Sequence, residues 1–263
     1  MRRSRAEKTQ PGNPHELSKR QHVFPRRSIE RFCDNGRVDL IDVVREKRRS
    51  ARPTDPAFCA DRVWNHGAET GFMKEIEDAF QALASSVIAS PELLLSAEQI
   101  AVINDFYGLW RSRAERRYLP TQRIGATGTL GTRVQYSQDD LERLEKHNII
   151  GVAPDGSFAM RDFMGSVIQL AIDDYNELLG REPWGIIQAE EGEFCVPDKP
   201  MKTVIPISPN VSLVRGAPNQ IAQRSEVARI NLAVADEARE YCFARNLVNC
   251  PGLLQSRLRN LIV

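Results

Sequence analysis

The sequence predicts an α+β fold, a single domain in which helices pack on a small antiparallel β meander. Helix-like and strand-like segments occur in separate blocks of the chain, whereas a doubly wound fold would alternate them. At Trp184 the spacing of hydrophobic residues also changes, from a helical period of about 3.6 to the alternation typical of strands.

Length and composition allow such a domain to bury its own core. The 263 residues are 41% hydrophobic and 27% charged, which is ordinary for a globular protein. No apolar run reaches the roughly 20 residues that a membrane helix needs, and no apolar segment follows the basic start that would mark a secretory signal. The five cysteines are odd in number and form no Cys-x-x-Cys motif, so we expect a cytoplasmic protein without a disulfide framework.

The first half of the chain is expected to be mainly helical. Residues 1–20 are polar and lack apolar periodicity, which predicts a disordered basic tail and leaves 21–263 as the domain. A short helix over 27–32 and a strand over 38–44 follow. Thr70 is a candidate N-cap for a helix running to about residue 88, and the Ser96–Gln99 capping box predicts a second helix ending in an arginine-rich turn near 117.

The second half begins with helices and continues with strands. A short helix is expected from Ser137, a hairpin from 149 with its turn at Asp155–Gly156, and a helix over 163–178 that ends before Pro183. Four β-rich runs then predict the meander, and they cover 184–188, 194–196, 204–207 and 211–214. A final long helix is expected to carry the apolar positions from Val227 to Cys242.

Five short motifs occur along the chain in a fixed order. They are Gln21-His22-Val23-Phe24-Pro25 with a later Phe32, a helix bearing Glu75 and Glu77, Pro197-Asp198-Lys199-Pro200, Pro206-Ile207-Ser208-Pro209, and Asn231. With these motifs, residues 20 to 245 resemble the bacterial domain-of-unknown-function family 4238. The resemblance implies no established activity. Val23-Phe24 stands in place of the usual Tyr-Val, and Val196-Pro197 in place of Thr-Ser, so a hydroxyl that could orient a substrate or a metal-bound water is missing.

One hypothesis is a metal-dependent hydrolase acting on phosphodiesters, like a nuclease. His22 would be the general acid or base, Asp198 and Glu75 would hold a Mg²⁺-type ion, and Lys199 would stabilise negative charge. Glu75 and Glu77 cannot both join the site, because residues two apart lie on different helix faces. The alternative roles are structural: a histidine that anchors the first helix, a turn aspartate and a surface glutamate.

The other hypothesis is a non-enzymatic binding module. Residues 1–52 hold fifteen lysines and arginines against seven acidic residues, and Arg45, Lys47, Arg48 and Arg49 form the densest cluster. Such a patch could contact nucleic acid or an acidic protein partner, or it could be a solvated loop.

Two further polar residues are predicted to be structural. Asn231 lies on or beside an apolar stripe and should tie the last helix to a strand or loop, and Arg113 should pair with a buried carboxylate. No tetrahedral zinc site is expected, because the four histidines and five cysteines lack ligand spacing. Gly125, Gly128 and Gly131 do not match a nucleotide-binding loop and predict a flexible connector.

Overall fold

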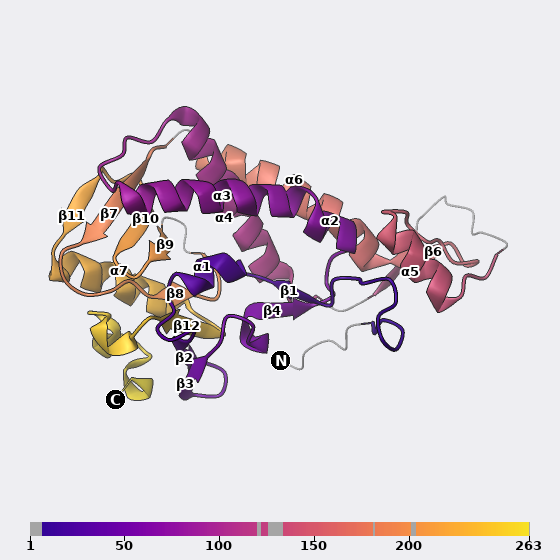
Figure 1. Cartoon of the computed structure of the whole chain (residues 1–263), viewed down its shortest axis with the longest axis horizontal. Coiled ribbons are helices and arrows are strands. Elements are labelled where there is room, and N and C mark those ends of the chain that lie inside the picture. The colour runs from indigo at the N-terminus through magenta and orange to yellow at the C-terminus, as the bar shows by residue number, and fades with distance from the viewer. Residues whose placement is uncertain (1–6, 120–121, 126–133, 181, 201–203, 263) are drawn as a thin grey trace.

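The computed structural model describes residues 7–119, 122–125, 134–180, 182–200 and 204–262, and it confirms the α+β fold as one compact unit (Figure 1). Most of the Gly125–Gly131 connector lies outside the described residues. The helices are α1 (Arg26–Glu30), α2 (His66–Thr70), α3 (Phe72–Ala89), α4 (Ala97–Arg116), α5 (Gln138–Lys146), α6 (Met160–Leu179) and α7 (Arg224–Glu237). The strands are β1 (Arg20–His22), β2 (Val38–Asp42), β3 (Lys47–Ala51), β4 (Cys59–Asp61), β5 (Arg123–Gly125), β6 (Ser157–Ala159), β7 (Trp184–Ala189), β8 (Val196–Pro197), β9 (Val204–Ser208), β10 (Val211–Arg215), β11 (Gln220–Ala222) and β12 (Tyr241–Ala244).

One four-stranded sheet contains most of the predicted meander. Its order is β11-β7-β10-β9, with β10 antiparallel to both β7 and β9 and with β11 parallel to β7. The prediction was wrong for residues 194–196, because this segment does not pair between β7 and β9. Its end, Val196, belongs instead to a second sheet.

The second sheet joins distant parts of the chain in the order β3-β2-β12-β8, with every pair antiparallel. The predicted last helix is therefore too long: α7 ends at Glu237, and Tyr241–Ala244 form the strand β12. All four residues of β12 are buried, so the strand shows no polar alternation. A short, fully apolar run cannot be assigned to helix or strand by its periodicity alone.

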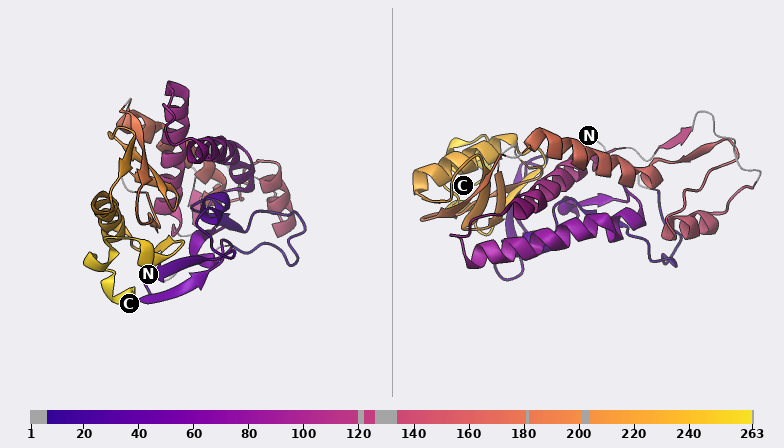
Figure 2. Two further views of the ribbon diagram at one scale, coloured as in Figure 1. Left: turned by 60° about the vertical axis from the view of Figure 1, so that its left-hand side comes forward. Right: turned by 90° about the horizontal axis from the view of Figure 1, so that it is seen from above.

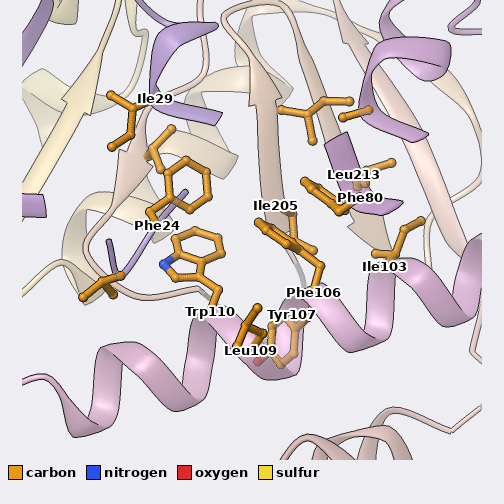
Figure 3. Close-up of a cluster of buried hydrophobic side chains, with 14 of the residues drawn as sticks. Phe24, Ile29, Phe80, Ile103, Phe106, Tyr107, Leu109, Trp110, Ile205 and Leu213 are labelled. Atoms are coloured by element: carbon orange, nitrogen blue, oxygen red, sulfur yellow. The ribbon is translucent and has the colours of Figure 1, made fainter. Parts of the chain in front are cut away.

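The core lies between the sheets and the long helices, with α4 at its centre (Figure 3). Phe24, just after β1, packs on Trp110 of α4 with ring centroids 4.5 Å apart, and Phe80 of α3 stacks on Phe106 of α4. Aromatic side chains bury large areas, so these contacts fix α3 and α4 against the segment after β1. Among the described residues, no helix is long and apolar enough to cross a membrane.

Two helix starts test the capping predictions. The Ser96 box is confirmed: Ser96 Oγ accepts from Gln99 N at 3.3 Å, and Gln99 Oε1 accepts from Ser96 N at 2.8 Å. Thr70 is not an N-cap, because it is the last residue of α2, whose own cap is Asn65. The chain bends at Gly71 before α3 begins.

The hairpin predicted from residue 149 has a different partner strand. Residues 149–152 form no strand, and β6 pairs with β5 instead. The Asp155–Gly156 turn is present, and Asp155 Oδ1 accepts from Ser157 N at 2.9 Å at the start of β6. With α5, the β5–β6 pair lies at the end of the molecule opposite the β7–β11 sheet (Figures 1 and 2).

The segment before β1 lies along α5 and is held there. His15 Nε2 is 2.7 Å from Asp139 Oδ1, Gln10 N donates to Glu142 Oε1 at 2.7 Å, and Leu17 is buried. The prediction of a disordered tail over residues 1–20 is therefore wrong for residues 7–20, while residues 1–6 lie outside the described part. Tertiary contacts order this segment although its composition is typical of a tail.

Candidate functional site

The predicted catalytic residues are not connected to one another. Across the described residues, no hydrogen bond or ion pair joins any two of His22, Glu75 and Asp198. His22 Nε2 lies 3.0 Å from the carbonyl oxygen of Pro53, Glu75 is exposed on α3, and Lys199 is half-buried beside Asp198.

Asp198 holds a turn of the backbone. Its Oδ1 accepts from Arg239 N at 2.8 Å, and its own N–H donates to Tyr241 O at 3.0 Å, so the residue fixes the connection from α7 to β12. Burial raises the pKa of Asp198, and hydrogen bonds from the backbone of Arg239 and Glu240 oppose that rise. The geometry is that of the structural alternative, a buried turn aspartate.

Two buried polar residues near Asp198 were not candidates from the sequence. Arg117 donates through Nη2 to the carbonyls of Ala57 and Cys59, and its guanidinium lies 5.7 Å from the ring centre of Tyr241. Arg117 Nε and Nη1 and the Tyr241 hydroxyl find no hydrogen-bond partner within the described ranges. The arginine-rich end of α4 is the one sequence signal that points to Arg117.

The described residues contain no group of three or more His, Cys, Asp or Glu side chains placed to hold a metal. Asp198 is engaged with backbone N–H groups, and Glu75 points from the exposed side of α3. The Mg²⁺ site predicted from Asp198 and Glu75 thus rests on the sequence alone.

The predicted basic patch is a strand with paired charges. Residues 47–51 form β3, which corrects the expectation of a solvated loop. Each arginine of the patch meets an aspartate: Arg45 with Asp42 at 3.0 Å, Arg48 with Asp39 at 2.8 Å and Arg49 with Asp55 at 2.7 Å. Lys47 is exposed. These aspartates neutralise much of the positive charge that binding to a phosphate backbone requires.

Asn231 makes the ties predicted for it. Its side-chain oxygen accepts from Cys195 N at 3.0 Å, and its Nδ2 donates to the carbonyls of Glu193 at 2.8 Å and Pro251 at 3.0 Å. The amide therefore connects α7 to the segment before β8 and to the C-terminal turns. Its side chain is fully buried, so each of these bonds satisfies a group that water cannot reach.

Arg113 also forms ion pairs, but its partners are half-buried carboxylates and not the buried carboxylate that was predicted. The guanidinium is 1% exposed and contacts the carboxylate of Glu77 on α3 and that of Glu69 on α2, the latter at 3.2 Å. Arg113 thereby joins three helices. Burial alone would lower its pKa, but these two carboxylates raise it above the ordinary value.

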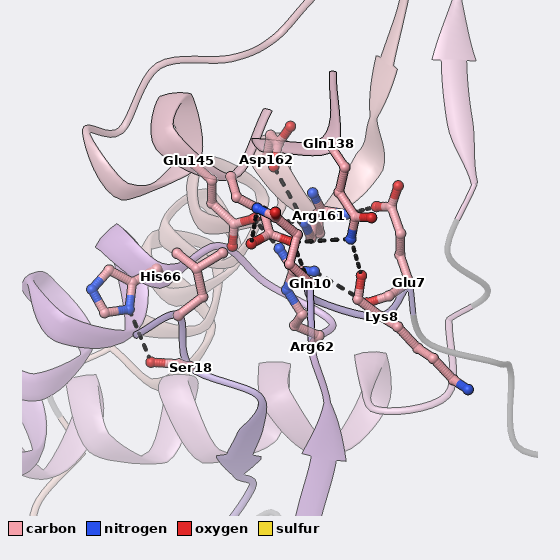
Figure 4. A network of polar contacts seen from close by, with 12 residues as sticks. Glu7, Lys8, Gln10, Ser18, Arg62, His66, Gln138, Glu145, Arg161 and Asp162 are labelled. Carbon is pink, nitrogen blue, oxygen red and sulfur yellow. Dashed lines mark hydrogen bonds and ion pairs between the residues drawn. The ribbon is translucent and has the colours of Figure 1, made fainter. Parts of the chain in front are cut away.

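A second polar cluster lies where α5, the start of α6 and the residues before α2 meet (Figure 4). Arg62 and Arg161 are 3% and 5% exposed, and both contact Oε2 of the buried Glu145, Arg161 through Nε at 3.1 Å. Burial raises the pKa of Glu145, and the neighbouring Arg62 opposes that rise. Two guanidiniums are thus fixed in direction by one carboxylate.

A pocket of about 370 Å³ opens on this cluster. Its walls include both arginines, Gln138 and Glu142 of α5, and residues 7–9 of the segment before β1, so this volume lies beside that segment. We call the surface formed by Arg62, Gln138, Glu142 and Arg161 the arginine groove. Glu142 is also buried, so charged side chains of both signs face the pocket from positions shielded from water.

Residues 7–10 of the same chain lie in the arginine groove. The carbonyl oxygen of Glu7 accepts from Arg62 Nη1 at 3.1 Å, and its carboxylate pairs with Arg161. The next carbonyl, of Lys8, accepts from Gln138 Nε2 at 3.0 Å. At the other end, Gln10 donates its N–H to Glu142 Oε1 at 2.7 Å. The groove thus contacts the backbone of an extended segment as well as its side chains.

None of the groove residues was a candidate from the sequence. One signal was present, because Arg161 lies three and seven residues before the buried Met164 and Ile168 and so shares the apolar face of α6. A charged residue on such a face needs a partner. Arg62 carries no comparable pattern.

Ser18 and His66, next to the groove, do not form a catalytic pair in which the histidine activates the serine as a nucleophile. Ser18 Oγ lies 3.1 Å from His66 Nδ1, while His66 Nε2 lies 3.2 Å from Lys146 Nζ. An ammonium group only donates, so Nε2 must accept and the ring proton stays on Nδ1, directed at Ser18. Burial and Lys146 lower the pKa of His66. The ring therefore cannot take the proton of Ser18 as a general base would.

Comparison with known proteins adds no relative: no family model matches the chain, and neither does any curated protein or solved structure. The resemblance to family 4238 stays a prediction from its motifs. The functional argument depends on the geometry of the chain itself.

Proposed function

We propose that the chain is a binding module that recognises an extended, glutamate-bearing segment of a protein partner in the arginine groove. One observation carries the proposal: the groove already holds a peptide segment, residues 7–10, whose glutamate contacts both buried arginines. The proposal keeps the binding-module hypothesis and moves its site from the Arg45–Arg49 patch to Arg62 and Arg161.

The two arginines are suited to a carboxylate because they are held in place before a ligand arrives. Glu145 contacts both, so binding costs little side-chain entropy. Hydrogen bonds between charged groups are strong when water is excluded, and an arginine fork matches carboxylate oxygens.

The groove favours a peptide over a nucleic acid. Gln138 donates to a peptide carbonyl and Glu142 accepts from a peptide N–H, which is the pattern of a polypeptide backbone. A phosphodiester backbone offers no N–H for Glu142, and its charge would be repelled by that carboxylate and by nearby Asp139.

The cellular setting of the proposal is the cytoplasm. All five cysteines are free in the structure, and four of them are buried. Free thiols of this kind fit a reducing compartment, where disulfides are rare.

The test is a binding titration with a labelled peptide that copies residues 6–12, Ala-Glu-Lys-Thr-Gln-Pro-Gly. We expect fluorescence anisotropy to show saturable binding that weakens about tenfold or more when the peptide glutamate becomes glutamine, because the peptide then loses its ion pair with the buried Arg161; a tenfold loss corresponds to about 1.4 kcal/mol. Arg161→Gln in the protein should cause a similar loss. Arg26→Gln, which changes an exposed arginine of α1 outside the groove, is the matched control.

Two results would contradict the proposal. The first is the same affinity for the glutamate and glutamine peptides. The second is binding that Arg161→Gln leaves unchanged while the variant keeps its thermal stability.

A second candidate function, the phosphodiester hydrolase with Mg²⁺, is favoured by one observation. Buried Asp198 has a raised pKa and lies in the electrostatic field of Arg117, whose Nε and Nη1 are unpaired within the described ranges. Shifted carboxyl groups beside a cation are common in active sites. In this proposal His22, Glu75 and Lys199 keep the roles that the sequence suggested.

The hydrolase proposal is tested with bis(p-nitrophenyl) phosphate and Mg²⁺. Turnover that requires Mg²⁺ and disappears in Asp198→Asn, with Asp61→Asn unaffected, would support it. No turnover by the folded protein over a range of Mg²⁺ concentrations would remove this candidate.

A further inference from the structure

The Glu7–Gln10 segment is, we propose, an intramolecular copy of the element that the arginine groove recognises in its partner, Glu-x-x-Gln, and it must leave the groove before the partner binds. This inference rests on the proposed function and adds the sequence pattern of the partner and the way in which access to the site is controlled.

The first position of the pattern is an acidic residue. Glu7 is the residue whose carboxylate reaches Arg161 while its carbonyl meets Arg62 Nη1 at 3.1 Å. Glutamine at this position would lose the charge that pairs with Arg161, so the groove prefers the acid.

The fourth position is an amide. Gln10 Nε2 donates to Asp139 Oδ1 at 3.1 Å and to Glu142 Oε2 at 3.2 Å, and both acceptors are carboxylates. A glutamate in place of Gln10 would meet two like charges, which the groove would reject.

The two middle positions are read through the backbone. At the second position the carbonyl of Lys8 accepts from Gln138, while its side chain extends away from the groove (Figure 4). At the third position Thr9 is half-buried at the wall of the pocket. The pattern is therefore Glu-x-x-Gln in an extended conformation.

The segment can detach without unfolding the domain. The Glu7 side chain is 44% exposed, so water reaches the outer side of its ion pair. Gly12 and Asn13 have positive φ angles of 78° and 53° in the turn that follows, and the first fully anchored apolar residue after it is Leu17. Release up to this turn exposes no core side chain, and such segments open at low cost in free energy.

The short connection to Leu17 makes the segment a competitor at high local concentration. A ligand tethered by a few residues is present at an effective concentration in the millimolar range. A partner binds only molecules whose groove is open. Its apparent affinity is therefore its affinity for the open groove multiplied by the fraction of molecules that are open.

The experiment uses the full chain and the peptide copying residues 6–12. Glu7→Gln removes the charge that holds the segment on Arg161, and we expect this variant to bind the peptide about tenfold more tightly than the unchanged protein. Glu16→Gln is the matched control, because it makes the same substitution at an exposed glutamate outside the groove. It should not alter the affinity.

Hydrogen exchange at Gln10 gives a second, independent measurement. The Gln10 N–H is bonded to Glu142, and we expect it to exchange faster in Glu7→Gln and also in the unchanged protein once peptide saturates it. Peptide binding that depends on Arg161 and is equal in both proteins would overturn this inference and leave the proposed function standing. No peptide binding to either protein, including Glu7→Gln, would overturn both.

Discussion

Asp55 accepts both arms of the Arg49 guanidinium, from Nη1 at 2.7 Å and from Nη2 at 2.8 Å. The same carboxylate accepts from Ala57 N at 2.9 Å and so caps the short 3₁₀ turn at Pro56–Phe58. The hydrogen bonds from Arg49 are the main reason that the pKa of Asp55 lies below its ordinary value.

This pair predicts a specific loss of stability in acid. Because the folded pKa of Asp55 is below its unfolded value of about 3.9, the ionised carboxylate stabilises the fold above that pH, and the contribution disappears as the pH falls through the folded pKa. We expect urea unfolding between pH 6 and pH 3 to show a smaller acid loss for Asp55→Asn than for the unchanged protein. Asp61→Asn, at the exposed last residue of β4, is the control. Parallel curves for both variants would contradict the prediction.

Asn231→Ala should destabilise the fold by roughly 2–4 kcal/mol, because it leaves the buried N–H of Cys195 and two carbonyl oxygens without their partner. Chemical unfolding measures the change. Asn210→Ala at an exposed turn should cost far less. A loss below about 1 kcal/mol for Asn231→Ala would mean that water replaces the amide.

Arg113→Met should cost about 3–5 kcal/mol, because two carboxylates lose a buried cation. Adding Glu77→Gln to this variant removes one of the unpaired charges. We therefore expect the double variant to unfold at a higher urea concentration than Arg113→Met alone. If the second substitution lowers stability further by its full single-variant cost, the two side chains are not coupled.

Asp198 is expected to respond to pH in the opposite sense to Asp55. Burial raises its folded pKa, so the folded state binds its proton more tightly, and this contribution to stability is lost as the pH rises from the unfolded pKa through the folded one. Asp198→Asn keeps an acceptor for Arg239 N and cannot ionise, so at pH 7 it should be at least as stable as the unchanged protein. Asp198→Ala removes the acceptor and should cost about 1–3 kcal/mol. A strongly destabilised Asn variant would show that the charge itself is needed.

Local signals predicted two helix ends correctly, the start of α4 and the end of α6. The capping box at Ser96 marks the start of α4 at Ala97, and Pro183 lies just beyond the end of α6 at Leu179. The sheets were harder, because β12 is apolar throughout and β8 has only two residues. Their assignment depends on partners far away in the chain, which periodicity does not contain.

Polar residues, too, could be predicted only where their signal is local in the sequence. Asn231 and Arg113 could be predicted because each interrupts an apolar helix face and must find partners nearby. The arginine groove could not, since Arg62, α5 and Arg161 come from separate parts of the chain and the bound segment has the composition of a tail. His22 and Asp198 were recognisable as unusual, but the structure engages both with backbone groups.

The place of β12 between β2 and β8 has a consequence for synthesis on the ribosome. Asp39 at β2 accepts from the N–H of Leu247, 208 residues later, so the β2–β3 hairpin leaves the ribosome long before the strand that completes its sheet. At roughly 5–20 residues per second, the inner edge of β2 stays unpaired for about ten seconds or more. An open strand edge invites pairing with other chains. A nascent chain stalled before residue 241 should therefore bind chaperones that a completed chain does not.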